Sequence, residues 1–80
     1  MEIIVNISAL KEDYEGVSIN DVKSDLVEFG AIVRGAKDVD GDTLMLINGD
    51  ITVEDVENAF FNIGVDVNDY IVEEDDLTIT

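Results

Sequence analysis

The first residues of the chain alternate in a way that predicts a strand. Ile3, Val5 and Ile7 are apolar and are separated by single residues, and a period of two places them on one face of a sheet. Residues 11–16 are mostly polar and end in Gly16, which indicates a loop. The chain is therefore expected to begin with a strand followed by a polar loop.

Two later segments have apolar residues three or four positions apart, a spacing that predicts amphipathic helices. A capping box begins each segment, Ser18 with Asp21 and Thr52 with Asp55, and a glycine follows each one, as is common at helix ends. The two segments form an internal repeat at an offset of 34 residues. Their apolar positions are Ile19, Val22, Leu26 and Phe29 in the first, and Val53, Val56, Phe60 and Ile63 in the second.

The remaining apolar runs predict a hairpin and a last strand. Residues 31–37 and 43–47 have strand patterns, and Asp40-Gly41 between them is a tight-turn sequence. The order β-α-β-β-α-β predicts an α+β fold, a split βαβ (ferredoxin-like) sandwich with two pseudo-repeated halves, in a single domain over residues 1–80. The apolar positions of the last strand are Val65, Val67, Tyr70 and Val72, and then Leu77 and Ile79; its register stays open, as does its division into two strands by residues 73–76.

Charge is the unusual property of this composition. The chain has 20 Asp and Glu against 4 Lys and Arg, a net charge of −16, although 46% of its residues are hydrophobic. The hydrophobic share predicts a folded core rather than disorder. Residues 38–80 hold 13 of the acids and no Lys or Arg. Repulsion among this many carboxylates opposes the compact state. The charge therefore indicates a role other than folding.

The chain lacks residue types that enzymes commonly use in catalysis. Cys and His are absent, which removes thiolate chemistry, Cys-based metal sites and the commonest general base. The sequence has no nucleophile elbow and no Gly-rich phosphate loop. We therefore expect a protein that is not an enzyme and needs no cofactor. A signal peptide and an apolar run of membrane-spanning length are not visible, so a cytoplasmic location is expected.

The segment Asp38-Val39-Asp40-Gly41-Asp42 resembles the start of a calcium-binding loop. Thr43 stands where such a loop needs Gly, and Gly49 stands where it needs Glu. The segment also lies between two strand patterns instead of two helices. An acidic hairpin turn is the favoured interpretation, and no specific metal site is expected.

Acidic residues form rows on the predicted helices. Asp21, Asp25 and Glu28 recur at i, i+4 and i+7 and share one side of the first helix, with consecutive acids about 6 Å apart. The phosphates of one DNA strand repeat every ~3.4 Å along the axis, so carboxylate rows can imitate them. The candidate partner-binding residues are Asp21, Asp25, Glu28, Glu54, Asp55, Glu57, Glu73, Glu74, Asp75 and Asp76. The acids that begin the second helix also suit its dipole, which is the structural alternative.

In charge layout and composition, the chain resembles the phage-encoded acidic DNA-mimic proteins. Its size, its lack of Cys, His and Pro, and its Ile- and Asn-rich, Ala-poor composition are similar to those of a Bacillus phage inhibitor of the histone-like nucleoid protein HU. The resemblance implies an inhibitor that binds the basic DNA-binding surface of a host protein, with HU as the leading candidate, and that acts in the host cytoplasm without contacting nucleic acid itself.

Two other classes of protein remain open. One is a halophile-type acidic domain, although ten Ile, four Ala and the concentration of acids in one half of the chain are not typical of it. The other is a weak calcium-binding module with a structural role, built on Asp38, Asp40 and Asp42.

Apolar residues outside the expected core predict a homodimer. In residues 44–47 every position is apolar, whereas a sheet with one bare face should alternate apolar and polar residues. With Ile3, Val5 and Ile7 facing the helices, the residues left for a dimer interface are Ile4, Met45, Ile47 and Phe61. A two-fold axis would cover this patch and align two acidic surfaces.

Overall fold

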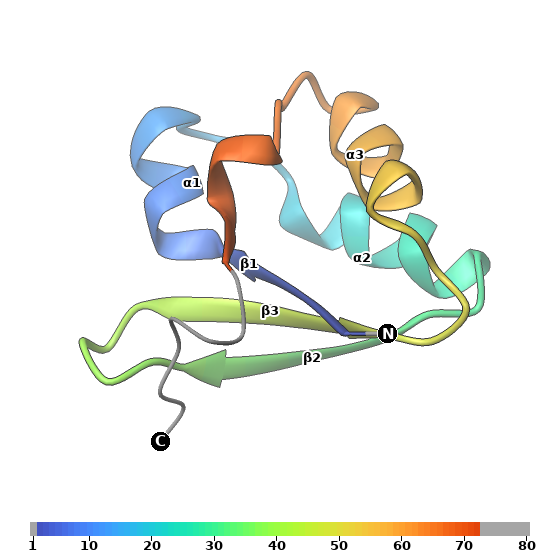
Figure 1. Ribbon diagram of the computed structural model, residues 1–80. Helices are drawn as coiled ribbons and strands as arrows, with labels where there is room; N and C mark the ends of the chain where they lie inside the picture. Colours follow the sequence, from blue (N-terminus) through green and yellow to red (C-terminus); the bar gives the residue numbers. More distant parts are fainter. Residues whose placement is uncertain (1, 73–80) are drawn as a thin grey trace.

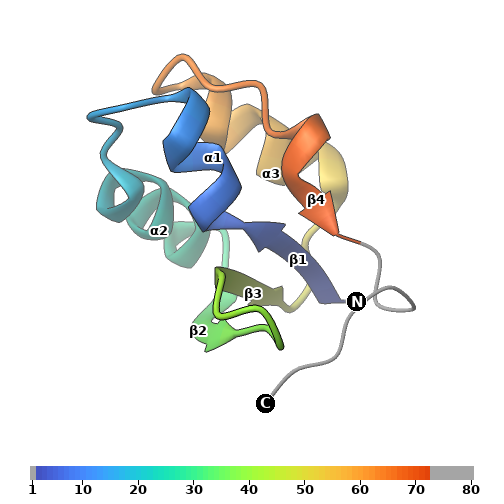
Figure 2. The same cartoon turned by 90° about the vertical axis from the view of Figure 1, so that its left-hand side faces the viewer.

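Four antiparallel strands form one sheet, and helices cover one of its faces (Figures 1 and 2). The computed structural model describes residues 2–72. In chain order the elements are β1 (Glu2–Asn6), α1 (Ile7–Asp13), α2 (Ile19–Glu28), β2 (Ile32–Lys37), β3 (Thr43–Asn48), α3 (Val53–Phe61), the 3-10 turn η1 (Asn68–Tyr70) and β4 (Ile71–Val72). The strand order is β2-β3-β1-β4, with every neighbouring pair antiparallel. The predicted α+β class is therefore confirmed.

The main core lies between the sheet and the helices. From the sheet, Ile3, Val5, Met45 and Ile47 face the helices, and Ile3 lies opposite Ile47 in the β1–β3 register. From the helices, the core receives the apolar stripes that the sequence predicts. Val22 and Leu26 of α2 and Val56 and Phe60 of α3 are fully buried. Packing of these two stripes on one sheet face positions the outer faces of both helices.

The opposite face of the sheet has a second, smaller apolar cluster. Ile4, Leu44 and Leu46 form it, with Ala36 and Val72 packed against them. Each of the three is at most 7% exposed. Ile4 lies on this face as predicted, because its strand neighbours Ile3 and Val5 point to the helices.

The structure corrects three of the residues assigned to a dimer interface. Met45 and Ile47 face the helices and are buried in the main core, so Leu44 and Leu46 are the residues of β3 that share the outer face with Ile4. Ile4 is itself only 2% exposed. The sequence did not decide the direction of β3, because both of its faces are apolar. Phe61, at 61% exposed, is the one member of the predicted set that lies at the surface.

The caps of the two predicted helices differ. At α3 the Asp55 N–H donates to Thr52 Oγ1 and the Thr52 N–H donates to Asp55 Oδ2, both at 3.2 Å, which confirms this capping box. At α2, Ser18 occupies the N-cap position without a side-chain hydrogen bond to the helix. The backbone angle ψ of the N-cap residue is 93° at Ser18 and 164° at Thr52, so the backbone approaches the two helices differently. The prediction of a capping box at Ser18 is therefore wrong.

A helix replaces much of the predicted loop after the first strand. The strand ends at Asn6, whose side chain accepts a hydrogen bond from the Ala9 N–H at 3.0 Å and caps α1. Ile7 then belongs to the helix, and Ile7 and Leu10 are its buried residues. The prediction of a loop over residues 11–16 is therefore wrong for the residues up to Asp13. The sequence pattern did not indicate this helix, because a helix of seven residues offers only this one buried apolar pair.

The end of the described chain has less strand than predicted. Val65 and Val67 are buried in the core but precede η1, and Tyr70 belongs to η1 itself. Within residues 2–72, the part of the predicted last strand that pairs with β1 is Ile71 and Val72. Leu77 and Ile79 lie outside the described residues.

Substitutions at two adjacent phenylalanines test which side of α3 packs in the core. Phe60 is fully buried, whereas Phe61 is 61% exposed. We expect Phe60→Ala to destabilise the fold by about 3–5 kcal/mol, because it removes apolar burial and leaves a cavity. Phe61→Ala should change stability by less than about 0.5 kcal/mol. Urea unfolding followed by circular dichroism measures both, and equal losses in the two variants would contradict the orientation of α3.

Candidate partner-binding surface

The acidic row predicted on α2 lies on the outer side of this helix. Val22 and Leu26 are buried against the core, whereas Asp21 and Glu28 are exposed and Asp25 is half-buried. Because these positions recur every three or four residues, the three carboxylates follow one side of the helix. The predicted row is therefore present at the surface.

The acids of α3 are less uniform. Glu54 is exposed, and Asp55 and Glu57 are half-buried. Asp55 closes the capping box with Thr52, so its carboxylate has the capping role that the sequence predicts. Glu54 and Glu57 have no such hydrogen bond among the side-chain contacts of residues 2–72.

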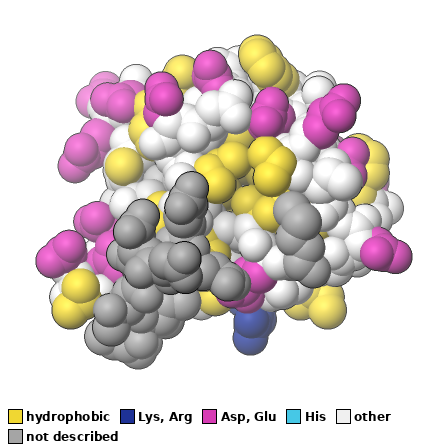
Figure 3. Space-filling view, in the orientation of Figure 1, with side chains coloured by type: hydrophobic (Ala, Val, Ile, Leu, Met, Phe, Trp, Pro, Cys, Tyr) yellow, Lys and Arg dark blue, Asp and Glu magenta, His cyan; other side chains and the backbone are white. Residues whose placement is uncertain are grey.

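The two acidic helices lie side by side on the same face of the sheet (Figures 1 and 2). Their acids therefore belong to one layer of the molecule. Figure 3 shows acidic side chains over much of this helix layer, with the colour of Lys and Arg at the lower edge of the view. The other predicted acids, Glu73, Glu74, Asp75 and Asp76, lie outside the described residues.

The helix acids have no basic partners among residues 2–72. Within this range the single ion pair joins Arg34 to Glu2, at 3.7 Å between Nη2 and Oε2. No charged or polar residue of this range is buried. The acids of α2 and α3 thus form no ion pair within this range and outnumber Lys11 and Lys23, the basic residues of the helices, and such a surface attracts a cationic partner at long range.

The acidic segment at residues 38–42 is a hairpin turn, as the favoured interpretation expected. The Asp38 carboxylate accepts hydrogen bonds from the N–H groups of Asp40 and Asp42, each at 2.9 Å, and Gly41 has a positive φ of 88°. Asp42 also accepts a hydrogen bond from the Asn6 side chain. The side chain of Asp38 is directed at its own turn, and residues 2–72 contain no acidic group of three arranged to hold a metal ion.

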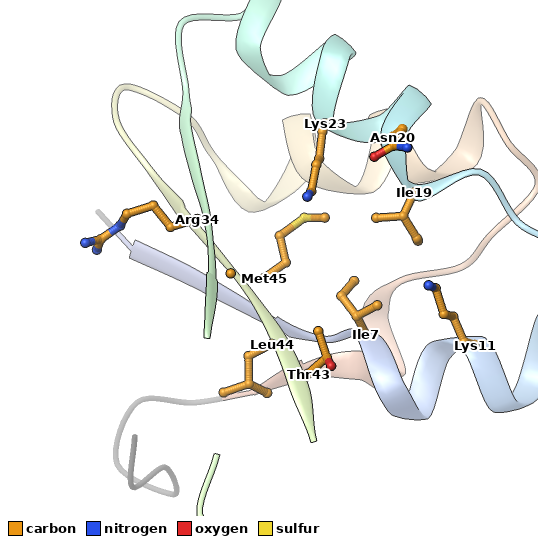
Figure 4. Close-up of a pocket in the computed structure, with 10 residues that line it drawn as sticks. Ile7, Lys11, Ile19, Asn20, Lys23, Arg34, Thr43, Leu44 and Met45 are labelled. Atoms are coloured by element: carbon orange, nitrogen blue, oxygen red, sulfur yellow. The ribbon is translucent and has the colours of Figure 1, made fainter. Parts of the chain in front are cut away.

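Sequence reasoning missed a pocket beside α1 and α2. Its lining includes Lys11 and Lys23 together with apolar residues of the core edge, and its volume is about 180 Å³ (Figure 4). The only sequence feature that could have indicated it is the pair Ile7 and Lys11, four residues apart, which share a side if this segment is a helix.

Tyr70 ties η1 to α1. Its hydroxyl donates a hydrogen bond to the Asp13 carboxylate, and its ring meets the Tyr14 ring edge to face, with centroids 6.1 Å apart. The hydrogen bond to Asp13, together with desolvation and the negative charge of Asp13, raises the pKa of Tyr70 from 10.0 to about 12. The folded protein therefore holds this proton more tightly than the unfolded chain.

This raised pKa predicts a stability that falls in alkali. The contribution of Tyr70 is complete below pH 10.0 and is lost as pH rises to about 12. In a Tyr14→Phe background, tyrosinate absorbance should show Tyr70 titrating near 12. Adding Asp13→Ala should move the midpoint toward 10.0. The same midpoint with and without Asp13, while circular dichroism shows a folded protein, would contradict the contact.

In comparison with known proteins, the chain matches no family model, no curated protein and no solved structure. Within residues 2–72, every helix is too short or too polar to cross a bilayer.

Proposed function

We propose that this chain is a DNA-mimic inhibitor that places its acidic helix layer on the basic DNA-binding surface of a host protein. The observation that carries the proposal is the row Asp21, Asp25 and Glu28 on α2, beside the acids of α3 and without basic partners in residues 2–72. In this proposal the chain is a binding protein rather than an enzyme, and it acts in the host cytoplasm.

The physical basis is electrostatic complementarity. Acids one turn apart on a helix are about 6 Å apart, and a second acidic helix beside the first widens the row into a charged surface. A cationic groove that normally holds phosphates would be drawn to this surface, and the attraction would fall with added salt because exposed charges are screened within ~8–10 Å. The first candidate target is the histone-like protein HU, on the strength of the resemblance in composition.

The finer classification of the fold is part of the same proposal. The strand order β2-β3-β1-β4, with antiparallel neighbours and α2 and α3 on one face, supports a split βαβ, ferredoxin-like sandwich. In this classification α1 is an addition between the first strand and the first crossover helix.

Competition for HU tests the proposed function. We expect the wild-type chain to displace short duplex DNA from HU in a fluorescence-anisotropy assay. Five substitutions that leave the Thr52 cap intact should weaken this displacement at least about tenfold, because each exposed charge contributes little but their effects add. These substitutions are Asp21→Asn, Asp25→Asn, Glu28→Gln, Glu54→Gln and Glu57→Gln.

A matched control separates the position of the charges from their number. It removes five exposed acids that lie off the two helices, through Glu12→Gln, Glu15→Gln, Asp40→Asn, Asp50→Asn and Asp69→Asn. This variant should displace DNA nearly as well as the wild type. Equal weakening in both variants would show that net charge alone acts, and displacement that does not change between low and high salt would reject the electrostatic mechanism.

We also propose that the chain forms a homodimer, with an interface different from the residues first assigned to it. Val27, Phe29 and Ile32 are each at least 58% exposed and flank the connection from α2 to β2. Strand β2 is an edge of the sheet in residues 2–72, and an edge strand offers unpaired backbone groups to a second copy. Phe61 is a further exposed apolar side chain, at the end of α3.

Sedimentation equilibrium at micromolar concentration and physiological salt tests the dimer. We expect a mass of twice 8.8 kDa for the wild type. The double variant Phe29→Ser/Ile32→Ser should lower the mass toward the monomer, because it removes exposed apolar area without touching the core. A wild-type mass of 8.8 kDa would reject the dimer and leave the competition experiment unaffected.

A further inference from the structure

The pocket beside α1 and α2 combines two lysines with apolar walls. Ile7 and Lys11 of α1 are one helical turn apart, and so are Ile19 and Lys23 of α2, so each helix contributes one apolar and one basic residue to the lining. Asn20 of α2 also lines the pocket, and the sheet provides Arg34 and Gly35 of β2 and Thr43, Leu44 and Met45 of β3. In Figure 4 the Lys23 side chain extends from α2 toward Met45, and the Lys11 side chain extends toward the α2 side.

The two lysines differ from the other basic residues in their contacts. Arg34 reaches away from the pocket (Figure 4) and pairs with Glu2 at 3.7 Å. Lys37 donates a hydrogen bond to Thr43 at 2.8 Å. Within residues 2–72, neither Lys11 nor Lys23 has a carboxylate within 4.0 Å or a side-chain hydrogen bond. In a chain with 20 acids, two exposed ammonium groups at one pocket are thus accessible to an external anion.

Gly35 leaves part of the pocket open. In the sheet register it lies opposite Met45, which faces the helices. A Cβ added at Gly35 would meet no atom within 4 Å, and the φ of Gly35 is not in the left-handed region. A side chain at this position would therefore fit the strand and fill the pocket without backbone strain. This makes Gly35 the position at which the pocket can be closed while both lysines stay in place.

The size and lining define the class of ligand. An apolar cavity of about 150 Å³ holds a benzene molecule, and this pocket has about 180 Å³. Ile7, Ile19 and Met45 suit an apolar body of that size, and the ammonium groups of Lys11 and Lys23 suit an anionic group at its edge. We propose that this pocket binds a small organic carboxylate with a compact apolar body. This site uses Lys11 and Lys23 rather than the acidic residues and does not rest on the DNA-mimic proposal.

Benzoate is a suitable probe, with neutral benzamide as its isostere and acetate as a carboxylate without the apolar body. Two-dimensional NMR of the full chain should show saturable shifts of the amides of Lys11, Ile19, Lys23 and Met45 with benzoate. The dissociation constant should lie in the millimolar range, because so few ligand atoms are buried. Benzamide should bind at least about fivefold more weakly, since it lacks the attraction to two lysines, and acetate should produce no saturable shift.

Two variants test separately how the lysine charges and the open volume of the pocket contribute to binding. Lys11→Gln/Lys23→Gln should reduce benzoate affinity to that of benzamide, and Gly35→Val should abolish binding of both while Val favours the strand. Circular dichroism and the dispersed amide spectrum check that each variant is folded. The absence of saturable shifts with benzoate, equal binding of benzamide and benzoate, or undiminished binding to a folded Gly35→Val variant would each overturn the proposal.

Discussion

Burial of apolar side chains between the sheet and its helices has to offset both the entropy of the chain and the repulsion among its carboxylates. The net charge is −16 over 80 residues, and repulsion at this density opposes the compact state. Fully buried residues come from every layer, among them Val5 of β1, Leu26 of α2 and Phe60 of α3. The strands meet the helices through one continuous core, so the position of every helix depends on this contact.

The same constraint places the acids. Because the buried positions of residues 2–72 are all apolar, the charged residues of each helix lie outside its buried stripe. The row Asp21, Asp25 and Glu28 is therefore a consequence of how Val22 and Leu26 pack. A partner that recognises this row would recognise a surface whose geometry is fixed by the core and needs no rearrangement on binding.

The sequence predicted the helices in which the apolar pattern extends over two or more turns, and the hairpin with its tight-turn sequence. The helices around Val22–Leu26 and Val56–Phe60 and the hairpin at Gly41 occur within a residue or two of their expected bounds, because an apolar stripe over two or more turns has one interpretation. Helix α1 was missed because Ile7 also continues the alternation of the first strand. The face of β3 could not be decided, because four successive apolar residues fit either orientation.

The candidate surfaces were predictable to different extents, because some depend on local sequence patterns and others on tertiary contacts. The position of the α2 acids outside the buried stripe follows from helical periodicity alone, and it was predicted. Use of Asp55 as a cap was predicted as well, but Asp55 was also assigned to partner binding, since a capping acid and a partner-binding acid occupy the same sequence position. The pocket was not predictable, because it joins Lys11 of the unexpected helix α1 to Lys23 of α2 and to a glycine of β2. Such convergence depends on tertiary contacts that local patterns do not contain.

Helix α2 carries both kinds of charged side chain, and its geometry separates them. With about 100° between successive residues, Asp21, Asp25 and Glu28 cluster beside one edge of the buried stripe of Val22 and Leu26. Lys23 lies next to that stripe, close in angle to Ile19, and so it borders the pocket between α1 and α2. An acidic surface and a basic pocket can thus share one helix of ten residues without pairing with each other. A cationic protein on the outer row and a small anion beside the core would contact different sides of α2, so substitutions on one side leave the contacts of the other in place.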